Sequence, residues 1–330
     1  MSETSRLSLA VESEEIVLPE AARIAVFGPA AGSDLSALPQ DLCHIITRFR
    51  PDHDYFAGLG FACATLPEGR YGASIVYAAR SKPLSFARIA QAASVTDGPV
   101  IVDGAKTDGI ESLLKACRAR TEVSGPLSKA HGKLFHFSAS DVFADWAVGA
   151  PQEIEGGFVT VPGVFSADGI DPASRLLGDH LPDKLGAAVA DLGAGWGYLS
   201  ARILERDSIK RLHMVEADHA ALGCAHHNVP DARAIFHWED ATRWRPEQPV
   251  DCVVMNPPFH IGRKGDPDLG RAFILSAAEM LTPRGQLWLV ANRHLPYEAD
   301  LAAAFADISE VGGDKSFKIL HCARPARKRR

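Results

Sequence analysis

The sequence predicts an α/β protein with two tandem domains, each built on a mostly parallel, doubly wound sheet. Three observations lead to this fold class. The chain has 330 residues, more than a single hydrophobic core usually fills. In its second half, short apolar runs alternate with helical patterns, as expected for parallel βαβ units. The first half repeats this order in outline, and we therefore divide the chain into domains 1–150 and 151–330.

The second half contains five predicted strands, each an apolar run that ends at a turn or leads into a helical pattern. The segment TPRGQ at 282–286 is a predicted turn before the last of them. The strands are expected at 187–193, 211–218, 232–240, 251–259 and 287–292, and the helices at 197–206, 221–228 and 269–281.

The first half is a weaker copy of the second. Helices are expected at 85–95 and 112–119, between apolar runs that correspond in order to those of the second half. The runs at 23–28, 73–80, 98–104 and 131–137 take the places of those at 187–193, 251–259, 285–292 and 315–321.

Composition and charge exclude several classes of protein. Hydrophobic residues make up 46% of the chain, but no apolar run is long enough to span a bilayer. The acidic start does not resemble a signal peptide, and scattered cysteines predict reduced thiols, so we expect a cytoplasmic protein. A net charge of −6 argues against general polyanion binding, although 324–330 forms a basic tail. No ligand cluster predicts a metal site.

A glycine-rich turn follows the run at 187–193. It reads D-L-G-A-G-W-G from Asp191 to Gly197, and such turns let a ligand approach the backbone at a helix N-terminus. A dinucleotide site would have a third glycine where this chain has Tyr198. The glycine pattern alone is equally compatible with a simple tight turn.

Two acids follow the next two predicted strands. Glu216 ends the second strand about 20 residues after the glycines, where an acid can accept hydrogen bonds from ribose hydroxyls. Asp240 ends the third strand, where it could meet an adenine amine. Each acid taken alone could equally be a helix cap or a solvated loop residue.

The most specific pattern is Asn256-Pro257-Pro258-Phe259, directly after the fourth apolar run. Two prolines end the strand and hold the backbone in a rigid, extended turn. The side-chain carbonyl of Asn256 and the carbonyl of Pro257 offer acceptors, and Phe259 offers a flat face. Such a site suits a planar base or amide whose NH₂ group must be held and aligned.

These motifs resemble a known family. The glycine turn is similar to motif I of class I S-adenosylmethionine-dependent methyltransferases, and Asn-Pro-Pro-Phe resembles motif IV of enzymes that methylate adenine N6, guanine N2 or glutamine N5. The segments PGVFSADGIDPASRLL (162–177), NPPFHIG (256–262) and LWLVANRHLPYEADL (287–301) are similar to RsmC-type small-subunit ribosomal RNA guanine-N2 methyltransferases. This resemblance covers 20–323 and is strongest from 158 onward.

The resemblance implies two Rossmann-like methyltransferase domains, the first degenerate and the second catalytic. It implies direct methyl transfer from S-adenosyl-L-methionine to a guanine of small-subunit ribosomal RNA, free or assembled, by a protein expected to be a monomer without a membrane partner. The implied catalytic residues are Asn256, Pro257 and Phe259, and the implied substrate residues are His260, Asn292 and Arg293. The implied cofactor-binding residues are Phe165, Ser166, Asp191, Gly193, Ala194, Gly195, Glu216, Asp240, Ala241 and Asn256.

The chain departs from motif I of the family at two positions, and two alternatives to the implied function remain. The chain has Ala194 and Trp196 where many copies of motif I have cysteine and a small residue, and we expect Trp196 to pack. The motif does not distinguish guanine N2 from adenine N6 or glutamine N5, and a noncatalytic, cofactor-retaining RNA-binding or assembly protein is the alternative from another class.

The first domain has Phe27 at the position of Asp191 and the residues 78–81 at the position of Asn-Pro-Pro-Phe. It is therefore expected to dock substrate, with Arg70, Arg80, Lys82 and Arg88 as candidate phosphate contacts, or to be structural.

Overall fold

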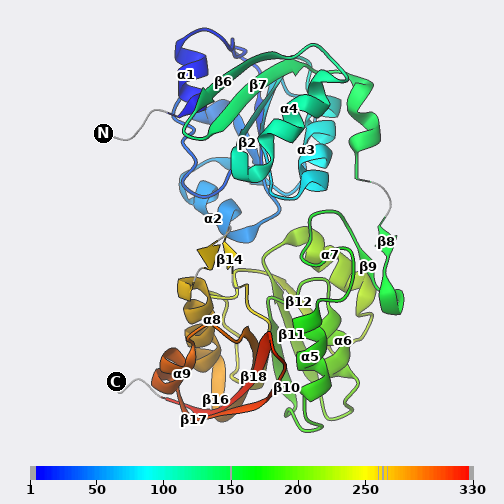
Figure 1. Ribbon diagram of the computed structural model, residues 1–330, viewed down its shortest axis with the longest axis vertical. Coiled ribbons are helices and arrows are strands. Elements are labelled where there is room, and N and C mark those ends of the chain that lie inside the picture. The colour runs from blue at the N-terminus through cyan, green and yellow to red at the C-terminus, as the bar shows by residue number, and fades with distance from the viewer. Residues whose placement is uncertain (1–4, 149–150, 259, 262–263, 266, 327–330) are drawn as a thin grey trace. The chain divides into compact units, whose positions relative to one another are not determined.

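The computed structural model of the chain describes residues 5–148, 151–258, 260–261, 264–265 and 267–326. The chain divides into two compact units, residues 1–150 and 151–330 (Figure 1). Each unit has one seven-stranded sheet, so the predicted α/β class with two tandem Rossmann-like domains is confirmed. No helix in the described ranges is both long and apolar enough to cross a membrane.

The first unit has the sheet order β3-β2-β1-β4-β5-β7-β6, with β6 and β7 antiparallel to the strands they pair with. Its strands are β1 (Ile24–Phe27), β2 (Cys43–Ile46), β3 (Ala62–Ala64), β4 (Ala73–Tyr77), β5 (Pro99–Ala105), β6 (Ser124–Lys129) and β7 (Gly132–Ser138). Its α-helices are α1 (Arg6–Glu12), α2 (Arg50–Gly58), α3 (Lys82–Val95) and α4 (Ile110–Arg118).

The second unit has the sheet order β12-β11-β10-β13-β16-β18-β17, again with the last two strands antiparallel to their neighbours. These strands are β10 (Ala188–Leu192), β11 (Arg211–Glu216), β12 (Ala234–Trp238), β13 (Val250–Met255), β16 (Leu281–Asn292), β17 (Phe305–Gly313) and β18 (Phe317–Pro325). Two small hairpins are formed by β8 (Gln152–Glu153) with β9 (Val159–Thr160), and by β14 (His260–Ile261) with β15 (Lys264–Gly265).

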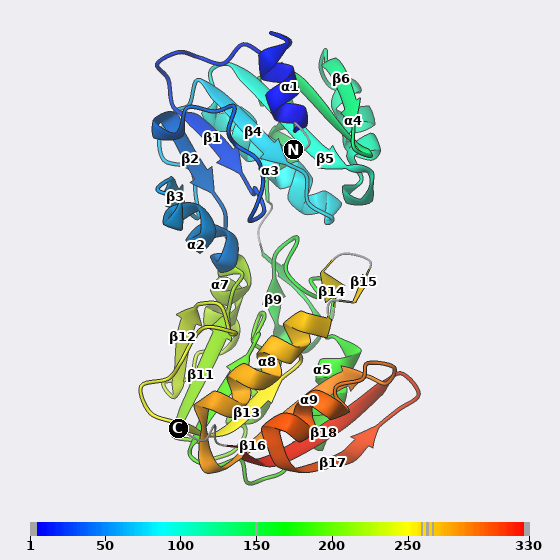
Figure 2. The same ribbon diagram turned by 90° about the vertical axis from the view of Figure 1, so that its left-hand side faces the viewer.

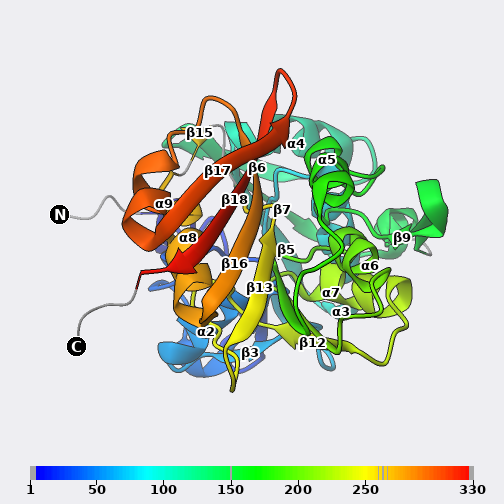
Figure 3. The same ribbon diagram turned by 90° about the horizontal axis from the view of Figure 1, so that it is seen from below.

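Helices cover both faces of the second sheet, as Figures 2 and 3 show. One face carries α5 (Pro172–His180), α6 (Tyr198–Leu204) and α7 (His219–Asn228), and the other carries α8 (Pro267–Met280) and α9 (Glu298–Ala304). Two hydrophobic cores correspond to the two faces. Leu177 and Ile203 belong to the first, Ile274 and Leu301 belong to the second, and all four side chains are fully buried. Neighbouring residues of the buried central strands point alternately into these two cores.

The two sheets have the same strand order, and their register aligns the two copies residue by residue. In the first, Phe27 pairs with Ile46 and Val76, and in the second, Leu192 pairs with Val215 and Met255. Phe27 therefore corresponds to Leu192.

The register corrects the alignment expected from the sequence by one position. The residue equivalent to Asp191 is Val26, and the residue equivalent to Asn256, directly after the paired strand, is Tyr77. Thr47 corresponds to Glu216. The first copy thus has no carboxylate at either position, as expected from a degenerate domain.

The glycine turn of the first copy is filled by an arginine. Gly28, which follows β1 as Gly193 follows β10, has a φ of 61°. A Cβ on Gly28 would lie 2.1 Å from the guanidinium carbon of Arg88, so that guanidinium rests directly on the turn. Its Nη1 donates to the carbonyl oxygen of Tyr77 at 2.8 Å. Arg88 is therefore an internal part of the first unit. Arg70, another candidate phosphate contact, pairs with Asp97 and donates to the carbonyls of Ser94 and Thr96.

The observed elements differ from the sequence predictions mainly at short or edge strands. No strand was predicted at β2, β3, β6 or β17, which are short or lie at the edge of a sheet, where apolar patterning is weakest. The predicted turn at 282–286 lies inside the bounds of β16, but pairing with β13 is interrupted there: Val250 pairs with Leu281, and the next regular pair is Cys252 with Gln286. The turn is thus a bulge-like interruption of one strand.

Candidate functional site

The predicted site residues lie at one edge of the second sheet. The strands β10, β11, β12, β13 and β16 are parallel, so their carboxyl ends meet at the same edge. The glycine turn, Glu216, Asp240, Asn256 and Asn292 each end or follow one of these strands. In open α/β sheets, ligands bind at this edge, where the strand order reverses. Here that reversal lies between β10 and β13.

The glycine turn leaves backbone open to a ligand. Gly193 and Gly195 have φ values of 73° and 57°, a region that side-chain-bearing residues adopt at a cost. Among the described residues, no atom lies within 4 Å of a Cβ built on Gly195, and the nearest to one on Gly193 is in Phe273, at 3.6 Å. Gly197 differs, because a Cβ there would be 2.8 Å from Val229. The first two glycines therefore form a cradle, and the third serves packing.

Asp191 lies beneath this turn and is fully buried. Its Oδ2 accepts a hydrogen bond from the Ser200 hydroxyl at 2.7 Å, and its Oδ1 has no partner in the described chain. Burial raises the pKa of Asp191 to about 7, although the hydrogen bonds from Ser200 lower it. A buried carboxylate oxygen without a donor fits a cationic or N–H-bearing group of a ligand.

Glu216 supports the glycine turn from the neighbouring strand. Its Oε2 accepts from the backbone N–H of Gly195 at 2.8 Å, and its Oε1 accepts from that of Asp218 at 2.7 Å. Burial raises the pKa of Glu216 to about 7, against these backbone hydrogen bonds, which lower it. Each oxygen has a second lone pair, so the carboxylate can also accept from ribose hydroxyls. Asp218 caps α7, as its side chain accepts from the N–H of Ala220.

Asp240 follows β12 and organises a turn. Its Oδ1 accepts from the N–H of Thr242 at 2.8 Å and from the Thr242 hydroxyl at 2.7 Å. Ala241 is buried beside it, and its carbonyl accepts from the hydroxyl of Ser276 at 2.7 Å. This arrangement fixes the Asp240 carboxylate through one oxygen, so the other can serve as an acceptor for an amine.

Asn256 follows β13 and is held by the start of α5. Its Nδ2 donates to Asp171 Oδ2 at 2.9 Å and to Ser174 Oγ at 2.8 Å. No donor from the described residues reaches its Oδ1. Pro257 is buried directly after it, so the amide stands on a rigid turn. Phe259 lies outside the described residues, and of His260 only its backbone position in β14 is described.

Phe165 and Ser166 are tied to the glycine turn. The carbonyl oxygen of Phe165 accepts from Trp196 Nε1 at 3.0 Å, and the Phe165 ring is 63% exposed. Ser166 has a φ of 50° and donates from its hydroxyl to the carbonyl of Gly169. The Trp196 ring is buried and packs against Phe158 with centroids 5.1 Å apart. Trp196 thus packs, as the sequence predicts, and also anchors this segment beside the turn.

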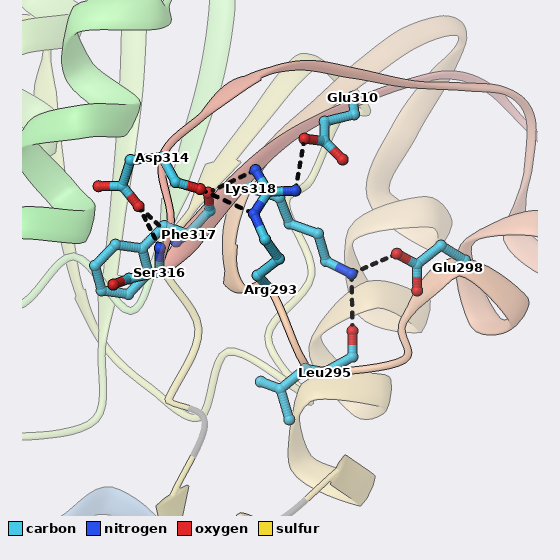
Figure 4. A network of polar contacts seen from close by, with 8 residues as sticks. All are labelled: Arg293, Leu295, Glu298, Glu310, Asp314, Ser316, Phe317 and Lys318. Carbon is cyan, nitrogen blue, oxygen red and sulfur yellow. Dashed lines mark hydrogen bonds and ion pairs between the residues drawn. The ribbon is translucent and has the colours of Figure 1, made fainter.

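Asn292 and Arg293 lie at the end of β16, beside an open cavity of about 550 Å³ that His294, Lys315 and Ser316 also line. Figure 4 shows that Arg293 forms hydrogen bonds with the hairpin of β17 and β18. Its Nε donates to the Asp314 carbonyl at 2.8 Å and its Nη1 to Glu310 at 3.0 Å.

A buried lysine anchors the same region. Lys318 donates to the Leu295 carbonyl at 2.9 Å and pairs with Glu298 (Figure 4). These contacts fix the segment after β16, in which Leu295 and Tyr297 are buried. His294 and Lys315, both exposed, also line the cavity.

Ser200, Asp171 and Ser174 are part of the site although sequence reasoning did not assign them. The D-P-A-S pattern at 171–174 signals a helix start, but its contact with a residue more than 80 positions later has no local signal. Within the described ranges, no group of three or more His, Cys, Asp or Glu side chains could hold a metal ion. The described site can thus bind a ligand along the glycine turn and present an amide acceptor beside it.

Comparison with known proteins gives matches over both the second unit and the whole chain. The family model "Methyltransferase small domain" matches residues 155–321. The ribosomal RNA small subunit methyltransferase C of Idiomarina loihiensis is 29% identical over 309 residues, which cover 88% of this chain and 90% of that protein. The ribosomal RNA large subunit methyltransferase G of Alcanivorax borkumensis is 35% identical over 169 residues, but they cover only 49% of this chain and 43% of that protein.

One solved structure matches nearly the whole chain. It is that of a T. thermophilus 16S rRNA guanine-N2 methyltransferase (RsmC) in complex with AdoMet and guanosine, with a TM-score of 0.80 and 23% sequence identity. The match covers 97% of this chain and 92% of that one. Both domains of the fold, and not only the second, are therefore shared.

Proposed function

Because this chain belongs to the methyltransferase small domain family, we propose that it transfers a methyl group from S-adenosyl-L-methionine to the exocyclic N2 amine of a guanine in small-subunit ribosomal RNA. The resemblance to RsmC-type enzymes expected from the motifs is confirmed by relatives of that name that match across both domains. The expected cytoplasmic location and monomeric state belong to the same proposal.

The cofactor site is formed by the glycine turn and the acids around it. Gly193, Ala194 and Gly195 line the cofactor through their open backbone. Asp191 holds the ammonium-bearing methionine portion through Oδ1, which has no partner in the described part of the chain. Glu216 accepts from the ribose hydroxyls, and the second oxygen of Asp240 accepts from the adenine amine. Phe165, Ser166 and Ala241 close the site from neighbouring loops.

When bound, S-adenosylmethionine supplies an electrophilic methyl group on a sulfonium. The chain must then bring a weakly nucleophilic amine into line with it. Asn256 and the carbonyl of Pro257 accept the two N–H bonds of the amine, which orients its lone pair toward the methyl. The guanine leaves its stack and lies on Phe259, and His260, Asn292 and Arg293 form the mouth of the site. The amine loses a proton to water after transfer, so no strong base is needed.

The observation that carries this proposal is the position of Asn256, at the strand end next to the open glycine turn. Its amide oxygen accepts from no donor among the described residues. We expect Asn256→Ala to lower turnover by about 100-fold, because a positioning contact is lost. Cofactor affinity should change less than about twofold, since most cofactor contacts lie on the glycine turn and the acids. Near-full turnover of the variant would refute the role of Asn256.

The substrate is tested by incubating the full chain with labelled cofactor and ribosomal subunits. We expect label in N2-methylguanosine of small-subunit RNA. The same assay should include large-subunit RNA, because the relative that is 35% identical is named as a large subunit methyltransferase. Label in that RNA, in N6-methyladenosine or in protein would replace the proposed substrate. Cofactor binding without any transfer would favour the noncatalytic alternative.

The first unit is proposed to bind no cofactor. Val26 and Thr47 stand in place of the two acids, and the guanidinium of Arg88 lies where the second copy has open space. Its role is then to dock substrate or to support the catalytic unit. A chain beginning near residue 150 separates these roles, because loss of RNA affinity alone indicates docking, whereas loss of solubility indicates support.

A further inference from the structure

The amide of Asn256 can adopt only one of its two flipped orientations. Its Nδ2 donates to Asp171 Oδ2 at 2.9 Å and to Ser174 Oγ at 2.8 Å. An ionised carboxylate is only an acceptor, so it must face the NH₂ end of an amide. The reverse orientation would place Asn256 Oδ1 against Asp171 Oδ2, where two acceptors repel each other. Asp171 therefore determines which end of the amide points away from α5.

The two acceptors are themselves fixed by the start of that helix. Asp171 is the N-cap of α5, and its Oδ2 accepts from the backbone N–H of Ser174 at 2.8 Å. Pro172 occupies the first turn, and Ser174 is buried. A single carboxylate oxygen thus accepts two hydrogen bonds, one from the backbone at the start of the helix and one from the Asn256 amide. The orientation of Asn256 is consequently set by a rigid element, as a positioned site requires.

The orientation of the Asn256 amide determines whether a substrate meets a hydrogen-bond acceptor or a donor. The target amine donates hydrogen bonds, so it needs an acceptor. With both N–H groups taken by α5, Asn256 presents Oδ1. With the amide reversed, it would present N–H groups to an amine, and donor would face donor.

We propose that Asp171 and Ser174 are positioning residues for methyl transfer, which take both N–H groups of Asn256 and so present its Oδ1 to the substrate amine. This inference rests on the proposed function. It assigns these two residues a role in turnover rather than in cofactor binding.

The first test is Asp171→Gly. Glycine is tolerated at an N-cap, so α5 should persist, but it offers no side-chain acceptor to Asn256. We expect kcat to fall by about 10- to 100-fold, because orientation at the reacting amine is lost. The cofactor Kd and the KM for RNA should stay within about twofold. Ser174→Ala removes one acceptor and should give a smaller loss of the same kind.

A double-mutant cycle separates positioning from a general structural effect. In an Asn256→Ala background, Asp171→Gly should change kcat by less than about twofold, because its target amide is gone. The matched control is Asp231→Gly, which makes the same change at a turn that precedes β12, at the opposite edge of the sheet. It should leave kcat unchanged. Equal losses from Asp171→Gly in both backgrounds would overturn the proposal, as would full activity of Asp171→Gly alone.

A readout that needs no substrate keeps this inference distinct from the function. The side-chain NH₂ of Asn256, identified by the NMR signal that Asn256→Asp removes, should exchange slowly with water in the wild type. It should exchange at least about tenfold faster in Asp171→Gly. Unchanged exchange would refute the orientation, even if methyl transfer occurs. Conversely, protected exchange in a protein that methylates no RNA would refute the function and, with it, the role of these residues in turnover.

Discussion

Replacing Asp191 by asparagine should stabilise the cofactor-free protein while weakening its binding of cofactor. Asp191 is fully buried, Ser200 donates to one of its oxygens, and the other oxygen has no partner among the described residues. Burial raises its pKa from 3.8 to about 7. The charged form is therefore disfavoured in the folded protein, and the amide of asparagine removes this charge without changing the volume.

The magnitude follows from the pKa. A rise from 3.8 to about 7 corresponds to roughly 4 kcal/mol of destabilisation once the group is ionised in both states. The penalty is absent below pH 3.8, grows as the pH rises, and is complete above about pH 7. A buried amide N–H without an acceptor costs about 1–3 kcal/mol. At pH 8, Asp191→Asn should thus be more stable by about 1–3 kcal/mol, and this advantage should shrink by roughly 2–3 kcal/mol at pH 5.

The assay is denaturation of the cofactor-free chain at several pH values between 5 and 8, followed by tryptophan fluorescence. Four of the five tryptophans lie in 151–330, so the signal reports mainly on the second unit. Asp251→Asn is a matched control, because Asp251 accepts from the backbone N–H groups of Ala187 and Ala188 at the other end of the sheet. It should gain no stability at any pH. A stability difference for Asp191→Asn that stays constant from pH 5 to 8 would refute a raised pKa.

Three further predictions use the same site. The pKa values of Asp191 and Glu216 are both raised to about 7, and a cofactor that contacts their charged forms must displace their protons. Cofactor affinity should therefore rise from pH 6 to pH 8. Calorimetry on Glu216→Gln should show cofactor binding weakened by about 10-fold or more, with a flatter pH dependence. Phe259→Ala should lose about 1–3 kcal/mol of base stacking, and Phe259→Trp should partly restore turnover, whereas equal activity of all three proteins would exclude stacking on this ring. Titration of the full chain should give one cofactor site, and two sites would contradict an inactive first copy.

Much of the fold could be predicted because its central strands are buried on both faces. The runs that became β10, β13 and β5 are continuous and apolar, so their pattern does not depend on distant contacts. The order of these runs also predicted that the chain contains two copies of one fold, which the identical strand orders confirm. The edge strands β3 and β6 could not be predicted in this way, because none of their residues is fully buried.

The one-residue error in aligning the copies has a physical reason as well. Both Val26 and Phe27 are buried and apolar, so the sequence offers no polar marker for the strand end. Only the pairing of Phe27 with Ile46 and Val76 fixes the register.

Some of the polar residues of the site could also be predicted from the sequence, and others could not. Asp191, Glu216 and Asn256 could be found because each lies at or directly after the end of a predictable strand, at a spacing that a ligand requires. The support of Asn256 by Asp171 could not be found, because a helix cap looks the same whether or not its second lone pair holds another side chain. The paired state of Arg293 was equally hidden, since its acceptors include the backbone carbonyls of Asp314 and Phe317.

Because the guanidinium of Arg88 occupies the turn at Gly28, the stability of the two units should depend differently on the concentration of the cofactor. The first unit holds its cationic occupant covalently, so no change in the concentration of any small molecule can empty that turn. If the second unit binds the cofactor as we propose, it gains free energy of unfolding of RT ln(1 + [L]/Kd), about 2.7 kcal/mol when the cofactor is at 100 times its Kd. When the cofactor is scarce, the second unit should therefore become the more easily unfolded part, while the first unit, whose turn Arg88 occupies, keeps its stability.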